Sequence, residues 1–361
     1  MASAQLPKYQ QVKRSLIAEI ELGRWATGGA IPSESQLLQR FNVSRPTLVR
    51  SLQDLVREGY LFRRQGKGTF VADRTPRNGE TVATATRSIP VFAARHTAQP
   101  AGTPGEVLLR LLRGAQAVLG PAHVDLSLRY AADGAVDEET ESFIEKTEPS
   151  VALVIEPSFS PKLRLELQRH GWVVWSVNEP WADGNAVYID QERAGYLAAR
   201  YLIEKRGCRH LALLNGPVDQ YWGFGARLRG YLTALQEAGI EPNKKLIREG
   251  WQVIDTEAGR AMMRDLLEGG VTVDGVVGAS DGKALGALAA AQERGRTVPD
   301  DLVIVGIDDI LAARATPPLP SVALPFEDVG RRAAEEALRA VIARDSTSPA
   351  EIQLKPTLVE R

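Results

Sequence analysis

The chain has 361 residues, of which 44% are hydrophobic and 25% are charged, and its formal net charge is −1 at pH 7. This length leaves room for more than one domain, and the balance is that of ordinary globular proteins. One cysteine, Cys208, excludes an internal disulfide and a metal site built from several cysteines. No apolar run approaches the roughly 20 residues that a membrane helix needs, and no leader segment is recognisable. We therefore expect a cytoplasmic protein.

The charges are unevenly distributed along the chain. Residues 1–74 hold 12 Lys and Arg against 6 Asp and Glu, which leaves 32 against 39 for the remainder. A basic segment attached to an acidic body directs attraction for a polyanion to one end of the molecule. Binding of such a segment to nucleic acid phosphates should weaken steeply as salt is added.

Three helices are predicted within the basic segment. Apolar residues between Val12 and Ile20 recur at the spacing of one helix face. Ser33, with Gln36 three residues later, forms a capping-box pattern that begins a second short helix. After a turn at residues 42–43, Ser44 can cap a third helix, because apolar residues share one of its faces. The members of that stripe are Leu48, Leu52, Leu55 and Val56.

The opposite face of the third helix is polar and cationic, and it carries Thr47, Arg50, Gln53 and Arg57. Two helices joined by a short turn, the second with such an outward face, are typical of a helix-turn-helix that reads a major groove. Arg45 lies at the tip of the third helix, where an arginine can donate two hydrogen bonds to a guanine edge.

A glycine-containing hairpin is predicted after the third helix. Residues 60–64 and 69–71 have the composition of two strands, and the glycines of residues 65–68 permit a tight turn. We interpret this hairpin as a wing whose cations can neutralise phosphates or reach a minor groove, while Ser33 and the start of the second helix can hold a phosphate. The wing cations are Arg63, Arg64 and Lys67.

Residues 7–71 resemble the GntR-type winged helix-turn-helix domain almost end to end. That resemblance implies a dimeric, sequence-specific DNA binder. The family usually has Ser-Arg-x-Thr-Val-Arg after the turn, whereas residues 44–49 read Ser-Arg-Pro-Thr-Leu-Val and an arginine follows only at Arg50, rotated roughly 100° around the helix. The predicted DNA-binding residues are Lys8, Ser33, Ser44, Arg45, Thr47, Arg50, Arg64, Gly66, Lys67 and Gly68.

The body of the chain is predicted to be an α/β structure. We divide the sequence into a head at residues 1–72, a polar linker at 73–88 and a body at 89–361. In the body, short apolar runs alternate with longer amphipathic stretches, which favours parallel sheets in two doubly wound lobes. The expected strands are 89–93, 124–128, 151–155, 173–177, 211–214, 273–277 and 302–305. The expected helices include 106–119, 161–170, 191–205, 226–238, 257–267 and 283–294.

The second half of the body resembles the effector domain of the lactose/galactose-repressor family, which shares its fold with periplasmic sugar-binding proteins. The resemblance is specific between residues 188 and 330 and weak between 89 and 176. It rests on Val187-Tyr188-Ile189-Asp190, Arg227-Leu228-Arg229-Gly230-Tyr231, Ala279-Ser280-Asp281 and the run from Val298 to Asp309. Together with the head, the architecture looks like that of GntR-headed arabinose-type repressors.

A site for an uncharged sugar needs bidentate donors, carboxylate acceptors and an aromatic wall. Arg227 and Asp281 match ligand positions of the family, and both follow predicted strands. Ser280 stands where the family usually has an asparagine, so specificity stays open. Asn178 could contribute from the other lobe, although loop capping is an equally good interpretation of it. The aromatic candidates, for which core packing is as good an interpretation, are Tyr221, Trp222 and Trp251.

Other kinds of site find little support. No strand leads directly into the glycines of residues 223–230, so these are not a dinucleotide fingerprint. The histidines are far apart, which argues against a metal site. Asp308 and Asp309 are neighbours that should point in opposite directions, which argues against an acid/base pair. We expect no cofactor and no metal.

The sequence therefore predicts a ligand-responsive transcription regulator, most consistent with a repressor that binds operator DNA as a homodimer. A small sugar or polyol would bind between the lobes and change the placement of the two heads. Two alternatives are a constitutive DNA-binding protein whose body binds no ligand, and a regulator fused to a pyridoxal-phosphate enzyme. The second would need a larger body and a Schiff-base lysine motif, and neither is recognisable.

Overall fold

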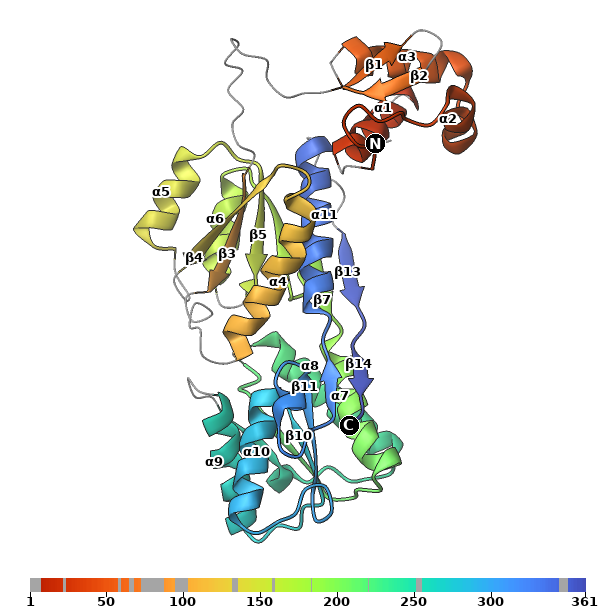
Figure 1. Ribbon diagram of the computed structural model, residues 1–361. Coiled ribbons are helices and arrows are strands. Elements are labelled where there is room, and N and C mark those ends of the chain that lie inside the picture. Colours follow the sequence, from red (N-terminus) through yellow and green to blue (C-terminus); the bar gives the residue numbers. More distant parts are fainter. Residues whose placement is uncertain are drawn as a thin grey trace.

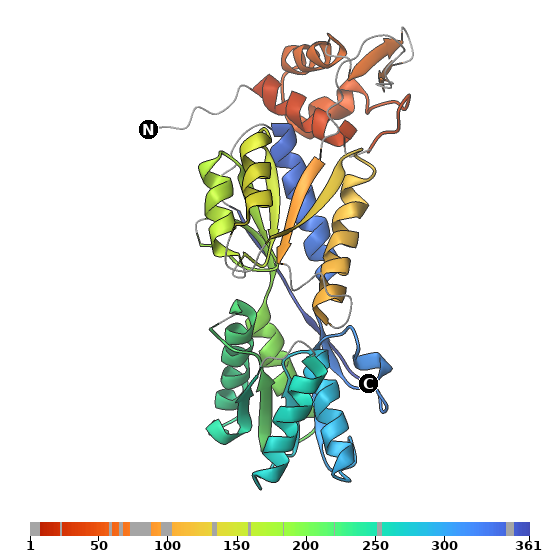
Figure 2. The same cartoon turned by 90° about the vertical axis from the view of Figure 1, so that its left-hand side faces the viewer.

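A small N-terminal head and a two-lobed body make up the chain in the computed structural model (Figure 1). The head lies at the outer end of the first lobe, where α1 contacts α11, and the two lobes follow one another along the long axis (Figure 2). The structure describes residues 8–21, 24–57, 60–64, 68–72, 88–94, 103–131, 136–157, 160–182, 184–219, 221–250, 255–343 and 350–361.

The head is the predicted three-helix unit with an antiparallel wing, and its apolar stripe forms one core. Leu48, Leu52 and Leu55 of the third helix are completely or almost completely buried in that core. Ala30 pairs with Phe70, which adds a short third strand to the wing. The elements are α1 (Lys8–Glu21), α2 (Glu34–Phe41), α3 (Arg45–Arg57), β1 (Leu61–Arg64) and β2 (Gly68–Val71).

Local contacts fix the turn between α2 and α3. The predicted capping box at Ser33 is present, with Gln36 closing it, and Asn42 ends α2 in the left-handed region at φ 47°. Arg40 at the end of α2 pairs with the buried carboxylate of Glu19 on α1, with Nη1 2.8 Å from Oε2. This bond to Glu19 raises the pKa of Arg40. The second helix is therefore tied to the first by a charge-assisted contact.

The first lobe contains a six-stranded sheet in the order β13-β7-β6-β5-β3-β4. Helices α4 and α11 cover one face, and α5 and α6 cover the other. Its strands are β3 (Ser88–Ala94), β4 (Asp125–Ala131), β5 (Val151–Ile155), β6 (Val173–Val177), β7 (Asn185–Ile189) and β13 (Glu351–Leu354). Its helices are α4 (Thr103–Leu119), α5 (Glu138–Lys146), α6 (Pro161–Arg169) and α11 (Phe326–Ala343).

The second lobe repeats this plan with the strand order β14-β12-β11-β10-β8-β9. Leu211 and Leu213 of β8 face α7 and α8, whereas Ala212 and Leu214 face α9 and α10, as the alternation of a strand requires. Its strands are β8 (Leu211–Asn215), β9 (Ile247–Glu249), β10 (Gly275–Gly278), β11 (Val303–Asp308), β12 (Ser321–Ala323) and β14 (Thr357–Val359). Its helices are α7 (Gln191–Arg200), α8 (Trp222–Glu237), α9 (Asp255–Glu268) and α10 (Asp281–Glu293).

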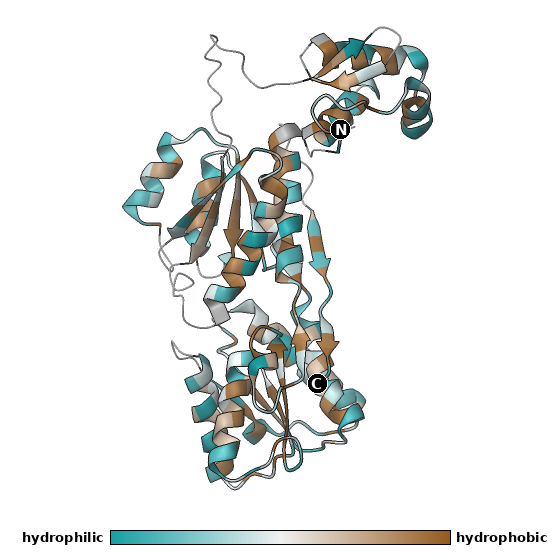
Figure 3. Cartoon of the chain, viewed as in Figure 1, coloured by the Kyte–Doolittle hydropathy of each residue, from teal (hydrophilic) through white to brown (hydrophobic). Residues whose placement is uncertain are grey.

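The predicted doubly wound α/β architecture is confirmed, with apolar strands inside and hydrophilic outer helix faces (Figure 3). The chain crosses between the lobes from β7 into α7, from β12 into α11 and from β13 into β14. Five strands and two helices were not among the predicted elements: β7, β9, β12, β13, β14, α5 and α11. The predicted helix at 191–205 is α7 continued by one π-helical turn at Tyr201–Lys205. Most of the predicted linker lies outside the described residues.

No helix in the described ranges combines the length and apolar character that crossing a membrane requires. Cys208 is buried, and that burial raises the pKa of its thiol to about 11.

Glycines allow three pairs of helices to approach unusually closely. A Cβ atom at Gly230 of α8 would lie 1.8 Å from the Glu192 carbonyl oxygen of α7, and one at Gly195 of α7 would lie 2.1 Å from the Arg227 carbonyl oxygen. The same reciprocal arrangement joins α4 to α11 through Gly114 and Gly330, and α9 to α10 through Gly259 and Gly286. Each lobe therefore depends on backbone-to-backbone contact between helices.

We expect Gly230→Ala to lower the free energy of unfolding by about 1–3 kcal/mol, because the added methyl group forces α7 and α8 apart. Gly225→Ala on the same helix is the matched control, since its Cβ would meet no atom closer than 3.7 Å. That control should be neutral or stabilising by about 0.5–1 kcal/mol. Urea unfolding of both variants measures the difference, and equal stability would contradict the close contact.

Candidate functional site

The tip of α3 presents polar groups to solvent. The side chain of Arg45, the first residue of the helix, is 77% exposed. The hydroxyls of Ser44 and Thr47 lie 2.8 Å apart and share a hydrogen bond, which holds Thr47 beside the tip. Lys8 and the Ser33 hydroxyl are exposed as well. These groups belong to the surface that the sequence predicts to bind DNA, and their contact with DNA stays a prediction.

Arg50 is exposed but its guanidinium is not free. Its Cζ lies 3.9 Å from the centre of the Tyr9 ring of α1, a cation–π contact. Ser51 reinforces the same junction, because its hydroxyl donates to the Tyr9 carbonyl at 2.8 Å. Arg50 is therefore held against the first helix, and a role in base reading would require it to leave that ring.

One carboxylate connects the third helix to the wing. Glu34 lies 3.9 Å from Arg45 Nε and 3.5 Å from Arg63 Nη2. Arg64 stacks near the rings of Phe62 and Phe70, with its Cζ 5.3 and 5.4 Å from their centres. Gly68 has a φ of 118°, consistent with the predicted turn, whereas Gly66 and Lys67 lie outside the described residues.

A second set of polar side chains, all buried except the half-buried Glu156, lies between the lobes, and we call it the inter-lobe cluster. It consists of Glu156, Asn178, Gln191, Tyr221, Arg227 and Asp308. Glu156 and Asn178 directly follow β5 and β6 of the first lobe, and Asp308 ends β11 of the second. Ligands of open α/β sheets bind at these carboxyl ends of strands.

Arg227 is the centre of the inter-lobe cluster. Only 6% of its side chain is exposed, and three polar groups surround its guanidinium. Its Nε donates to Gln191 Oε1 at 2.9 Å, its Nη1 donates to the Ala279 carbonyl, and its Nη2 lies 3.7 Å from Asp308 Oδ1. A buried guanidinium without such partners would be strongly destabilising.

Two contacts involve Glu156 of this cluster, one within the first lobe and one between the lobes. Asn178, at a left-handed φ of 67°, donates its amide to Glu156 Oε1 at 2.8 Å. Tyr221, at the start of α8, is hydrogen-bonded to Glu156 from the other lobe. Burial raises the pKa of Tyr221 well above its usual value, and the Glu156 charge adds to this shift. The phenol therefore stays protonated, and its O–H group donates a hydrogen bond to the carboxylate.

The carboxyl group of Asp308 is also perturbed. Burial raises its pKa well above the ordinary value, the Arg227 charge opposes this, and the nearby Asp281 carboxylate adds to it. Asp309, its neighbour, instead pairs with Arg361 at 2.6 Å, so the two aspartates point to different partners as expected.

Three buried amide atoms of this region find no hydrogen-bond partner among the described residues. They are Asn178 Oδ1, Gln191 Nε2 and Asn215 Oδ1. The orientation of two of these amides is fixed, because Asn178 donates to Glu156 and Gln191 accepts from Arg227. Leaving a buried polar atom unpaired costs about 1–3 kcal/mol, so a hydrogen-bond partner at any of these atoms would be favourable.

A charged group in the second lobe adjoins the cluster. Lys283 of α10 is 1% exposed and pairs with Asp255 at the start of α9, whose other oxygen accepts from Ser280. The Lys283 ammonium lies 5.2 Å from the centre of the Phe224 ring, and Arg227 Cζ lies 5.8 Å from the same centre. Phe224 thus separates two buried cations.

Asp281 has a structural role that the sequence did not reveal. It is completely buried, and its Oδ2 accepts three backbone N–H groups, from Ile310, Leu311 and Ala312, at 2.7, 2.8 and 3.0 Å. Its Oδ1 accepts the Ser321 hydroxyl at 2.6 Å. These bonds occupy both carboxylate oxygens, and the ligand contact of Asp281 stays a prediction.

The aromatic candidates separate in the structure. Tyr221 belongs to the inter-lobe cluster, but Trp222 turns away from it and packs edge-on against Tyr188 at 5.7 Å between ring centres. Trp251 lies outside the described residues. Sequence reasoning missed Glu156, Gln191, Asp255 and Lys283. The position of Glu156 directly after β5 is the same signal that singled out Asn178 after β6.

Comparisons with known proteins agree with a DNA-binding head followed by a two-lobed body. The family model described as bacterial regulatory proteins, gntR family, matches residues 8–71, and that of a periplasmic binding protein-like domain matches residues 199–361. The chain is 27% identical to the arabinose metabolism transcriptional repressor of Geobacillus stearothermophilus over 383 residues, which cover 100% of this chain and 98% of that protein.

A second relative matches about half of the chain. The HTH-type transcriptional repressor PurR of Edwardsiella ictaluri is 37% identical over 178 residues, which are 49% of this chain and about half, 51%, of that protein. Among solved structures, the transcriptional regulator CelR in complex with cellobiose has a TM-score of 0.66 at 25% identity and covers 88% of this chain and 90% of its own. A LacI-family regulatory protein from Chloroflexus aggregans has a TM-score of 0.65 at 26% identity, with 76% and 97% covered.

The structural role of Asp281 can be tested by Asp281→Asn. The substitution places an amide N–H against backbone donors, so we expect the free energy of unfolding to fall by about 2–3 kcal/mol. Asp265→Asn, which removes a 66% exposed carboxylate of α9, is the control and should change stability little. Unfolding by urea measures the stability of both variants. An undiminished stability of Asp281→Asn would contradict the structural role of this carboxylate.

Proposed function

We propose that this chain, which joins a gntR-family DNA-binding domain to a periplasmic binding protein-like domain, is a transcription regulator that binds operator DNA as a dimer and responds to a neutral sugar or polyol. The observation that carries the proposal is the inter-lobe cluster, where a buried guanidinium, two carboxylates and the unpaired amide oxygen of Asn178 meet at the carboxyl ends of strands. The relatives are transcriptional repressors, which favours repression here.

On the DNA side, the head offers both kinds of contact that a specific complex needs. Arg45, exposed at the tip of α3, has the geometry to donate to a guanine edge. Exposed Ser33, Arg63 and Arg64 surround that tip and are suited to phosphates. Phosphate oxygens would replace Glu34 as the partner of Arg45 and Arg63, because the two ion pairs with Glu34 are long.

On the ligand side, the chemistry of the inter-lobe cluster favours an uncharged molecule with several hydroxyls. Hydroxyl groups can donate to Asn178 Oδ1 and to a carboxylate, and they can accept from the Arg227 guanidinium. A phosphorylated ligand would bring negative charge next to Glu156 and Asp308, where the raised pKa of Asp308 already reports an unfavourable environment for negative charge. The cellobiose bound to the CelR relative is a neutral saccharide.

Coupling between ligand and DNA would act through closure of the lobes. Tyr221 and Glu156 face each other across the lobes, so a ligand that contacts both changes the relative stability of open and closed arrangements. The head lies on the first lobe, with α1 against α11, and α11 is reached by one of the crossings between the lobes. In a dimer, such closure would alter the distance between the two heads.

The DNA surface is tested by Arg45→Ala. We expect affinity for a site selected by the wild-type protein to fall by about 1–3 kcal/mol, roughly 5- to 150-fold, because a bidentate base contact is lost. Arg24→Ala is the control, since it removes an equally positive side chain of the head that is 62% exposed but precedes α2. Fluorescence anisotropy at fixed salt measures both variants. Equal losses would mean that Arg45 acts only through its charge.

The ligand site is tested by thermal unfolding of the full chain with a panel of neutral sugars, polyols and nucleosides. A ligand at about 100 times its Kd should stabilise the folded protein by about 2.7 kcal/mol. Arg227→Lys should lose this stabilisation, because a lysine cannot hold Gln191, Ala279 and Asp308 together. Arg200→Lys, at an exposed position of α7, should retain it. If no compound stabilises the wild-type protein, the regulator binds DNA without an effector of these classes.

A further inference from the structure

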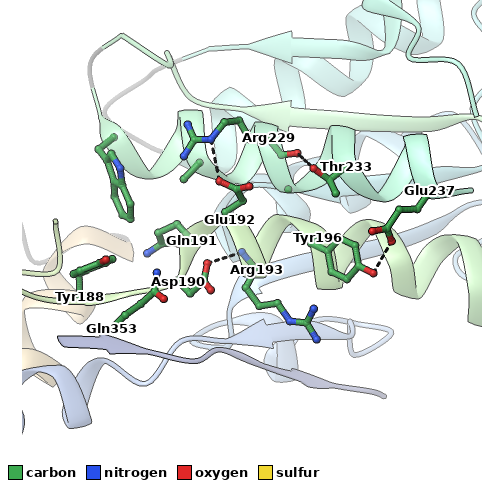
Figure 4. A pocket seen from close by; sticks show the side chains of 13 residues that line it. Tyr188, Asp190, Gln191, Glu192, Arg193, Tyr196, Arg229, Thr233, Glu237 and Gln353 are labelled. Atoms are coloured by element: carbon green, nitrogen blue, oxygen red, sulfur yellow. Dashed lines mark hydrogen bonds and ion pairs between the residues drawn. The ribbon is translucent and has the colours of Figure 1, made fainter. Parts of the chain in front are cut away.

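A groove on the outside of the second lobe has no role in the function proposed above. It lies between α7 and α8 beside the crossing strands β7 and β13, and it encloses about 480 Å³ (Figure 4). Tyr188 and Gln353 line it from the first lobe, whereas Tyr196, Arg229 and Glu237 line it from the second. A molecule held there would contact both lobes next to the points where the chain crosses.

This groove is distinct from the inter-lobe cluster. Gln191 is the one member of the cluster that also lines the groove. Its side-chain oxygen accepts a hydrogen bond from Arg227 Nε. Its amide nitrogen is completely buried and has no hydrogen-bond partner in the part of the chain that the structure describes. Figure 4 shows that nitrogen turned toward the side of the groove where Tyr188 lies. A hydroxyl oxygen is the acceptor that this donor lacks.

The walls of the groove combine hydrogen-bonding groups of both signs. Glu192 of α7 pairs with Arg229 of α8 at 2.9 Å, and Tyr196 donates to Glu237 at 2.7 Å. These pairs line the two helices at successive turns, as Figure 4 shows. Because the carboxylates are balanced by guanidinium and phenol donors, the groove offers little net attraction for an ion. It suits a neutral molecule that donates and accepts many hydrogen bonds.

One end of the groove is aromatic. The half-buried Trp222 meets Tyr188 edge-on at 5.7 Å and 89°, which leaves both rings fixed across the two lobes. Rings next to carboxylates, amides and guanidinium groups are the combination that recognises sugars, whose rings have an apolar face and a hydroxyl rim. We propose that this outer groove is a second binding site, separate from the inter-lobe cluster, and that it takes a neutral saccharide.

The proposal is tested by 19F NMR on the full chain labelled with 5-fluorotryptophan, with cellobiose, maltose and methyl glucoside as probes. Trp222→Phe assigns the Trp222 resonance. Thr233→Phe fills the groove from an exposed position of α8, and Gln236→Phe places the same side chain on an exposed position of α8 that does not line it. Both substitutions are at the surface, so each variant is expected to fold.

At least one probe should shift the Trp222 resonance saturably in the wild-type protein and in Gln236→Phe, and the shift should be lost in Thr233→Phe. A resonance that none of the probes moves would overturn the proposal. A shift that persists unchanged in Thr233→Phe would overturn it too, because the probe would then act from another site, the inter-lobe cluster included.

Discussion

The arrangement of the body depends on one buried positive charge. Arg227 cannot be buried without acceptors, and its partners come from three places in the second lobe: the start of α7, the end of β10 and the end of β11. Their convergence places a guanidinium at the carboxyl ends of the strands, directly beside Tyr221, which faces Glu156 of the first lobe. Arg227 therefore connects several elements of the second lobe and also lies next to the contact with the first lobe.

Glycine contacts make this convergence possible. Gly195 lets α7 meet the backbone of α8 at Arg227, and Gly259 lets α9 meet the backbone of α10 at Lys283. Both buried cations of the second lobe are therefore positioned by close helix pairs that tolerate no side chain at the contact. Small shifts of these helices would move the charges directly, which connects the packing of the lobe to the chemistry of the inter-lobe cluster.

Much of the head could be predicted from the sequence because its determinants are local: a capping box, a left-handed residue at the turn and an apolar helix stripe. In the body, most of the buried strands were recognisable as apolar runs, whereas β13 and β14 were missed because they are short and contain only exposed and half-buried residues. The ligand contacts predicted for Arg227 and Asp281 stay predictions. The sequence could not show the structural role of Asp281, because the backbone groups that bind its carboxylate lie about 30 residues later and meet it only in the folded chain.

The central claim is that a ligand at the inter-lobe cluster controls DNA binding, and the most direct test is operator affinity measured as the stabilising sugar is added. In the wild-type protein, affinity should change saturably by roughly 5- to 150-fold, the range of ordinary coupling free energies. In Tyr221→Phe the change should be smaller, since the hydroxyl that reaches Glu156 across the lobes is gone. An operator affinity that stays constant while the sugar demonstrably binds would contradict the claim.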